Sequence, residues 1–317
     1  MKFRRISVLF FLSLYFLWSL KLLEFYINSD QVHYISYYEA SKDASFVEIP
    51  VLGYAYLGSI EPISLFLLWL GAKLGIAKNV YISILNVILA FGVIEVLRKY
   101  KVPWHTYIFV FSNYYFLVLM TGAERLKISY ILLVYSVLIR NRISNLLLLL
   151  TPLAHFQSFI LFLSLFLEKY SRYIFRIIVK LRCTKRLIQS VILTLTAVLL
   201  CSSLVSLDPL GLKVLNYTKE ADGLSEIINI SILLVLSLLV TKYRLKLLIS
   251  FVPLIILTYI LGNMRVNMIA FTFVFFFFLK EGRMANPIFI LLLVYFSIKS
   301  WLFVNNIFVY GTGFYAE

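Results

Sequence analysis

Long apolar stretches alternate with short basic loops from one end of this chain to the other, and this alternation limits what it can fold into. Of the 317 residues, 62% are hydrophobic and only 14% are charged. A soluble fold of this length cannot hide so much apolar surface, so the sequence predicts an all-α, polytopic membrane helical bundle. The bundle is expected to form a single integral membrane domain over residues 1–317, without internal repeats.

Basic residues predict which loops face the cytoplasm. Six clusters hold 20 of the 30 Lys and Arg residues, and by the positive-inside rule they mark cytoplasmic loops. These clusters span residues 2–5, 98–101, 140–142, 169–186, 242–246 and 280–283. Anionic lipid of the inner leaflet accounts for the net charge of +15, so no nucleic-acid partner is expected. The first apolar run lacks an Ala-x-Ala cleavage site, which favours an uncleaved anchor over a signal peptide.

Apolar segments between these loops predict roughly eleven crossings, with the C-terminus outside. The expected crossings are 6–27, 79–97, 104–121, 125–139, 143–154, 156–167, 187–206, 227–241, 245–262, 266–279 and 286–304. Segment 59–78 is expected to be re-entrant or a short hairpin, because one crossing there would move the cluster at 98–101 outside. The segment is expected to be interrupted at Glu61-Pro62, Gly71 and Gly75. Stretches 28–58 and 207–226 are expected outer loops, and 168–186 an interfacial cytoplasmic helix.

This topology brings a set of polar residues to the outer face. They are Asp30, His33, Glu61, Glu124, Arg125, Lys127, His155, Gln157, Asn263 and Arg265. Arg125 and Arg265 each begin an expected helix, where unpaired N–H groups and the helix dipole favour an anion. A guanidinium suits phosphate oxygens, so these two helix starts predict a diphosphate site, with Lys127 as a further cation.

Acid–base candidates lie on the same expected face. His155 suits a general base of near-neutral pKa, with Asp30 or Glu61 as the carboxylate alternative. Snorkelling arginines, a structural histidine and a belt of interfacial tyrosines are the simpler interpretations of the same residues. The sequence has no metal-ligand spacing and no Gly-rich phosphate loop, so neither a metal nor a nucleotide cofactor is expected.

Four short motifs resemble a known family in their order. They are Asp30-Gln-Val-His-Tyr34 with Tyr37 and Tyr38, Gly122-Ala-Glu-Arg125, Leu153-Ala-His155-Phe-Gln-Ser158, and Asn263-Met-Arg265. This order resembles the EpsG-like, Wzy-type polysaccharide (O-antigen) polymerases of bacteria, and the bundle resembles GT-C type membrane glycosyltransferases.

The resemblance implies a metal-independent transferase of the inner membrane, acting at the periplasmic face in lipopolysaccharide or exopolysaccharide synthesis. It would transfer a glycan from undecaprenyl diphosphate to a second lipid-linked repeat unit, with membrane lipid and a chain-length regulator protein as further partners. His155, Asp30 and Glu61 would be catalytic, and Arg125, Arg265 and Lys127 would bind the diphosphate. The glycan would contact Tyr34, Tyr37, Gln157 and Asn263.

The sequence also leaves three other functions open. An O-antigen ligase-like transferase would use the same donor, but it predicts a longer outer loop than the chain offers. A lipid-linked oligosaccharide flippase or other transporter predicts charged residues along both halves of a cavity and internal duplication. A membrane acyltransferase predicts a histidine near the cytoplasm or in mid-helix, where only His105 comes close.

Overall fold

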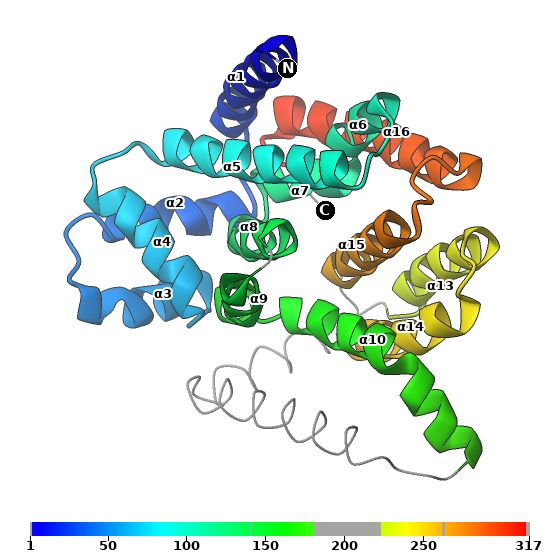
Figure 1. Cartoon of the computed structure of the whole chain (residues 1–317). Helices are drawn as coiled ribbons and strands as arrows, with labels where there is room; N and C mark the ends of the chain where they lie inside the picture. The colour runs from blue at the N-terminus through cyan, green and yellow to red at the C-terminus, as the bar shows by residue number, and fades with distance from the viewer. Residues whose placement is uncertain (1, 140, 181–222, 262–263, 315–317) are drawn as a thin grey trace. The chain divides into compact units, whose positions relative to one another are not determined.

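A computed structural model describes the chain except for residues 1, 140, 181–222, 262–263 and 315–317, drawn as a grey trace in Figure 1. Every secondary-structure element of the described residues is a helix, which confirms the expected all-α class. Contacts divide the chain into two compact units, Met1–Phe156 with Ile290–Glu317, and Gln157–Phe289. The single membrane domain expected from the sequence stays a prediction.

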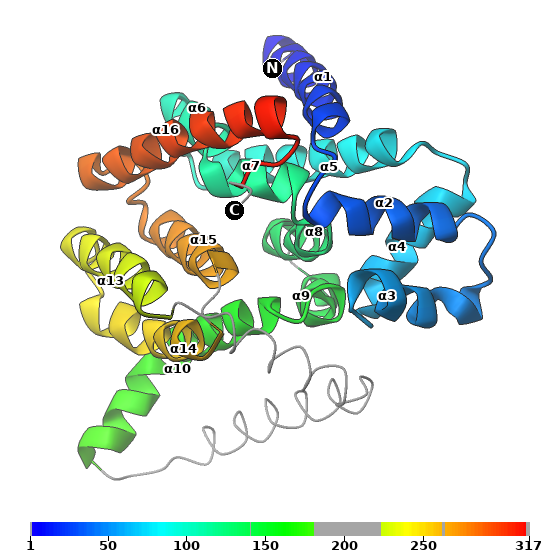
Figure 2. The ribbon, with the colours of Figure 1, turned by 180° about the vertical axis from the view of Figure 1, so that it is seen from behind.

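The first unit holds the helices that carry most of the candidate residues. Its elements are α1 (Lys2–Phe25), α2 (Asp30–Ala40), η1 (Phe46–Glu48), α3 (Ile49–Leu57), α4 (Pro62–Lys73), α5 (Lys78–Lys99), α6 (Trp104–Phe111), α7 (Tyr114–Thr121), α8 (Glu124–Leu138), α9 (Arg142–Ala154) and most of α16 (Pro287–Tyr310). Helix α5 packs against α1 and α8, and α8 packs against α9. Helices α2, α3 and α4 form a group beside α8 and α9, as both ribbon views show (Figures 1 and 2).

The second unit is built from four described helices. They are α10 (Ser158–Lys180), α13 (Gly223–Val240), α14 (Arg244–Leu261) and α15 (Met264–Glu281). Helix α14 packs against α10 and α13, and α15 packs against the other three. The expected crossing 187–206 and most of the outer loop 207–226 lie outside the described residues.

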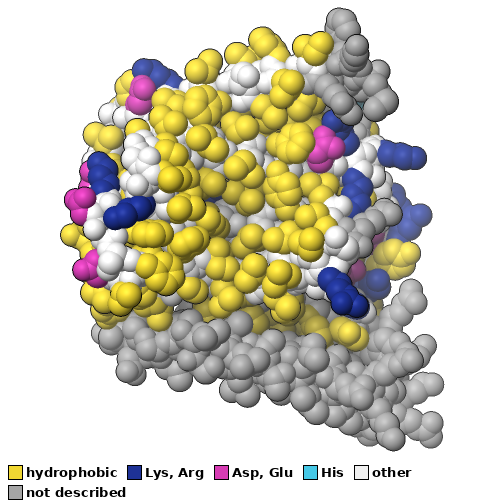
Figure 3. Space-filling model, turned by 60° about the vertical axis from the view of Figure 1, so that its left-hand side comes forward, with side chains coloured by type: hydrophobic (Ala, Val, Ile, Leu, Met, Phe, Trp, Pro, Cys, Tyr) yellow, Lys and Arg dark blue, Asp and Glu magenta, His cyan; other side chains and the backbone are white. Residues whose placement is uncertain are grey.

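Three described helices are long and apolar enough to cross a membrane: Ile6–Phe25, Lys78–Lys99 and Pro287–Tyr310. A fourth span is obtained if the bent pair Phe46–Leu57 and Pro62–Lys73 is counted as one. Large apolar side chains are exposed along α1 and α16, and hydrophobic side chains cover much of the face in Figure 3. These features identify a membrane protein.

Several of the remaining expected crossings fall on helices too short to cross a membrane alone. Helices α6, α7, α8 and α9 have 8, 8, 15 and 13 residues. At about 1.5 Å per residue they extend about 12–22 Å, against about 30 Å for a hydrocarbon core. Expected crossing 104–121 is divided between α6 and α7 at Asn113, whose side chain accepts a 2.9 Å hydrogen bond from the Tyr115 N–H. The count of eleven therefore stays a prediction.

The expected interruption at Glu61-Pro62 is present, as a bend of 101° between α3 and α4. The expectation that Gly71 interrupts the segment is wrong, because Gly71 lies within α4. A Cβ atom at Gly71 would lie 2.7 Å from the Tyr38 hydroxyl and from the Tyr81 ring, so this glycine permits close packing. Gly75, with φ of +69°, follows the end of α4 as expected.

The expected outer loop 28–58 is largely helical, which corrects the sequence prediction. Because the stretch is rich in polar residues, the sequence offered no sign that one side of α2 is buried. The residues on that side, Gln31, Tyr34, Tyr37 and Tyr38, are all less than 9% exposed. Helix α10 continues to Lys180. It joins the expected crossing 156–167 to much of the basic stretch 168–186, which was expected to be an interfacial helix.

Candidate functional site

Three helix ends of the first unit bring Glu61, Arg125 and His155 into direct contact. Nη1 of Arg125 donates to Oε2 of Glu61 at 2.7 Å, and Nδ1 of His155 lies 2.9 Å from Oε1. The Phe156 N–H also donates to Oε1, at 3.1 Å. One carboxylate is therefore held by a guanidinium, an imidazole and a backbone amide.

Local sequence explains why these side chains lie at helix ends. Pro62 is the first residue of α4, and it restricts Glu61 to the extended backbone (φ −67°, ψ 101°) that starts the helix. Helix α9 ends just after Pro152, and His155 is extended at φ −155° and ψ 118°. Arg125 is the second residue of α8, in the turn where the helix dipole is positive.

Two hydroxyl groups complete the cluster. Nε of Arg125 donates to the Tyr34 hydroxyl of α2 at 3.4 Å. The buried Ser64 hydroxyl donates to the carbonyl of Ala154 and lies 3.4 Å from the carbonyl of Arg125. Ser64 thus links the start of α8 to the end of α9, and it fixes the backbones that carry the guanidinium and the imidazole.

The cluster is buried and adjoins an apolar core. Glu61, Arg125 and His155 are 9%, 6% and 4% exposed. The core cluster that includes Tyr34 also includes Leu65, Leu68, Ile82, Ile128 and Ala154. In such a low-dielectric environment an unpaired charge is very costly, so the ion pair must be kept or replaced by a charged ligand.

A second buried network starts at the preceding residue, Glu124. Its Oε1 accepts hydrogen bonds from Nζ of Lys78 at 2.9 Å and from Nε2 of Gln31 at 3.0 Å. Gln31 also donates to the Thr121 carbonyl and accepts from Lys78. Helix α2 contacts both networks, because Gln31 and Tyr34 are three residues apart on one side of the helix.

Lys78 and Ser64 are the residues that sequence reasoning missed. Lys78 begins a long apolar helix and is only 8% exposed. A cation where the expected re-entrant segment 59–78 meets the expected crossing 79–97 is the signal that could have identified it. No comparable signal exists for Ser64, a serine in an apolar run whose partners are distant carbonyl groups.

The other candidates of the first unit have varied surroundings. Asp30 begins α2, one helical turn before Tyr34 on the same side. The Tyr37 hydroxyl donates to the Leu65 carbonyl at 2.9 Å, within the apolar core. Lys127 is fully buried, and its Nζ donates to the Met120 carbonyl of α7 at 2.9 Å.

Three candidates belong to the second unit or lie outside the described residues. Gln157 is half-buried and accepts the Ile160 N–H at its carbonyl, just before α10. Arg265 is the second residue of α15, so it begins a helix as expected. Asn263 lies outside the described residues. The two-arginine diphosphate site therefore stays a prediction.

Proton transfer and anion binding are the chemistry that the first-unit cluster offers. Nδ1 of His155 lies 2.9 Å from Oε1 of Glu61, and a proton placed on Nδ1 would leave Nε2 as the basic nitrogen. A carboxylate that orients a histidine in this way is a common arrangement of general bases. Arg125 adds a cation at a helix N-terminus beside this base.

Comparison with protein-family models, curated proteins and solved structures finds no match for this chain. Within the part of the chain that the structure describes, no group of three His, Cys, Asp or Glu side chains is arranged to hold a metal ion.

Proposed function

We propose that the chain is an oligosaccharide repeat-unit polymerase of the bacterial inner membrane, with its site at the periplasmic face. It transfers a glycan from undecaprenyl diphosphate to a sugar hydroxyl at the non-reducing end of another lipid-linked repeat unit. The observation that carries this proposal is the buried contact of Glu61 with both Arg125 and His155.

Each member of the cluster has a distinct role in this reaction. The acceptor hydroxyl attacks the anomeric carbon of the donor and forms the new glycosidic C–O bond, while Nε2 of His155 takes the hydroxyl proton. The bond from the anomeric carbon to the diphosphate oxygen breaks, and the diphosphate leaves with the electron pair. Arg125 stabilises the charge that grows on the leaving group, and Glu61 orients both side chains.

The membrane environment supports this assignment. Ionisable residues buried in a membrane protein are costly to retain, and they commonly mark substrate or proton pathways. A lipid-linked donor is already anchored in the bilayer, so binding at membrane depth supplies much of the positioning that the reaction needs. The four motifs that resemble the EpsG-like polymerases include Tyr34, Arg125 and His155, which the structure brings together.

A deletion strain complemented with variants of the gene tests the proposal. The wild-type chain is expected to restore a ladder of surface polysaccharide, and His155→Ala is expected to restore single repeat units only. A ligase would instead leave long polymer on the lipid carrier in the deletion strain. A flippase would leave repeat units on the cytoplasmic side. Either result would contradict the proposal.

A further inference from the structure

A second feature of the first unit, a groove lined by α1, the end of α5, α6 and α16, lies outside the proposed reaction. Its volume is about 1110 Å³, which exceeds the range of about 300–1,000 Å³ for ordinary ligand pockets. Helices α1, α5 and α16 are the three described helices that are long and apolar enough to span a membrane. The groove is therefore lined by helices that can span a bilayer.

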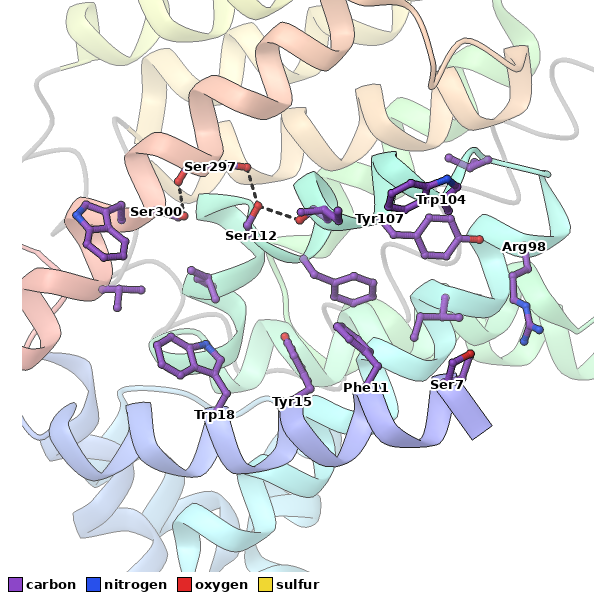
Figure 4. A pocket seen from close by; sticks show the side chains of 18 of the residues that line it. Ser7, Phe11, Tyr15, Trp18, Arg98, Trp104, Tyr107, Ser112, Ser297 and Ser300 are labelled. Atoms are coloured by element: carbon purple, nitrogen blue, oxygen red, sulfur yellow. Dashed lines mark hydrogen bonds between the residues drawn. The ribbon is translucent and has the colours of Figure 1, made fainter. Parts of the chain in front are cut away.

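Apolar and aromatic side chains form the walls of this groove. Helix α1 contributes Ser7, Phe11, Tyr15 and Trp18, which follow one side of the helix (Figure 4). Eleven residues separate the first and last of them, or about 17 Å at 1.5 Å per residue. This length matches one leaflet, about half of a 30 Å hydrocarbon core.

The serine hydroxyls at Ser112, Ser297 and Ser300 are paired with protein atoms, whereas the buried Tyr15 hydroxyl has no hydrogen-bond partner among the described residues. The hydroxyls of Ser112 and Ser297 lie 2.8 Å apart, and that of Ser112 donates to the Ile108 carbonyl at 2.8 Å. Ser300 donates to the Ser297 carbonyl at 2.6 Å. Because most of the lining is apolar and the Tyr15 hydroxyl is the one buried hydroxyl of the lining without a partner in the described part of the chain, the walls suit an apolar occupant better than a sugar.

One end of the groove is basic. Arg98 and Lys101 line it there, and Figure 4 shows Arg98 at the same end as Ser7, opposite Trp18. Arg98 also pairs with Glu95 at 2.6 Å, in a surface salt bridge that adds little stability. An occupant with an apolar body and an anionic head matches this distribution.

The backbone at Lys101 is unusual for a lysine. Its N–H donates to the Arg98 carbonyl, and the Val102 N–H donates to the Leu97 carbonyl, each at 3.0 Å. This pair of bonds defines a Schellman motif, in which glycine usually occupies the left-handed position. Lys101 occupies that position with φ of +54°, so the chain accepts backbone strain to place an ammonium group at the groove.

We propose that this groove binds an anionic phospholipid of the bilayer, with acyl chains along α1 and the phosphate against Arg98 and Lys101. Bilayer lipid is the species present at this depth, and a phosphate supplies negative charge beside Lys101 and Arg98, of which Arg98 also pairs with Glu95. The proposal does not depend on the enzymatic function proposed above.

Native mass spectrometry of the purified chain, titrated with phosphatidylglycerol or phosphatidylcholine of identical acyl chains, tests this site. The wild-type chain is expected to bind phosphatidylglycerol more tightly. Lys101→Gly is expected to weaken that binding about fivefold and Arg98→Gln with Lys101→Gly about thirtyfold, because each basic group near a lipid surface contributes about fivefold. Arg142→Gln, an exposed basic side chain elsewhere, is the matched control and is expected to bind like the wild type.

Lys101→Gly also separates binding from folding. Glycine suits the left-handed position, so this variant is expected to be at least as thermally stable as the wild type while it binds less lipid. Unchanged phosphatidylglycerol binding in the double variant would overturn the proposal, as would equal wild-type affinity for the two lipids.

A bulky substitution tests occupancy by a second copy of the chain. Ser297→Trp fills the groove and is expected to displace phosphatidylglycerol, whereas Ser13→Trp, on an exposed part of α1, is not. If Ser297→Trp abolished a dimer and left lipid binding unchanged, the groove would be a subunit interface and the proposal would be wrong.

Discussion

Oε2 of Glu61 lies 2.7 Å from Nη1 of Arg125, although 64 positions separate the two residues in the sequence. Both side chains are buried, and the same carboxylate contacts Nδ1 of His155. A buried pair of this kind is weak evidence for stability as such, because desolvation offsets much of the attraction. Its position at three helix ends favours a functional reason for keeping it.

Removal of one partner from this pair is expected to destabilise the fold strongly. Glu61→Ala leaves the Arg125 guanidinium buried without its carboxylate, which typically costs about 3–5 kcal/mol. Thermal aggregation of the detergent-purified variant measures the effect. Glu61→Leu combined with Arg125→Leu is expected to be more stable than Glu61→Ala, because no unpaired charge remains. A double variant that is less stable than the single one would contradict this energetic account.

Arg125→Lys is expected to damage polymer formation nearly as much as Arg125→Ala. Lysine keeps the charge, but it offers a point donor on a flexible stem in place of a planar fork. Loss of one preorganised donor to developing charge typically reduces the rate about 10²–10³-fold. Polysaccharide length at matched protein level measures the effect, with Arg142→Lys as the control. Full activity of Arg125→Lys would assign Arg125 an anchoring role.

His155→Ala is expected to fold, reach wild-type membrane levels and lose polymer. The imidazole is the expected proton acceptor, whereas its removal leaves the ion pair of Glu61 and Arg125 in place. His33→Ala is the matched control, because His33 is an exposed histidine of α2. Immunoblots of membranes and polysaccharide ladders provide the two measurements. Wild-type polymer length in His155→Ala would make His155 structural.

The Lys78–Glu124 pair is expected to matter far more for stability than a surface pair of the same chemistry. Its side chains are 7% and 1% exposed, against 58% and 50% for Lys21 and Glu24. Lys78→Met is expected to lower stability by about 3–5 kcal/mol, and Lys21→Met by less than about 1 kcal/mol. Thermal aggregation compares the two variants directly. Equal effects would show that the buried network does not stabilise α8.

Cysteine labelling tests the orientation of the chain. Both native cysteines, Cys183 and Cys201, are first replaced by serine. A membrane-impermeant thiol reagent applied from outside is expected to modify Lys42→Cys, in the expected outer region, and to leave Lys101→Cys unmodified. The reversed pattern would place the Glu61–Arg125–His155 cluster on the cytoplasmic side and exclude a periplasmic polymerase.

Sequence reasoning succeeded where a local chemical signal exists. The long apolar runs predicted α1, α5 and α16, whose lengths suit a bilayer. Glu61-Pro62 marked the bend between α3 and α4, because a proline at a helix start and the restricted residue before it leave a clear pattern. The helix starts at Arg125 and Arg265 were also correct.

It failed where tertiary contacts decide the structure. Helices α2 and α3 were expected to be loop, because the tyrosines and charges of α2 gave no apolar run and α3 is a run of only 9 residues, yet the tyrosines of α2 are buried. Nothing local revealed that Glu61 would contact both Arg125 and His155, or that Ser64 would link two backbones. These contacts join residues that are far apart in the sequence, so they depend on the tertiary packing of the helix ends.

Polymerisation by the purified chain in lipid nanodiscs, supplied only with a lipid-linked repeat unit, tests the central claim most directly. The account predicts a ladder of lengthening lipid-linked glycans from the wild type, release of one undecaprenyl diphosphate per bond formed, and neither product from His155→Ala. No ladder from the wild type with the repeat unit of its own cell, or an equal ladder from His155→Ala, would contradict it.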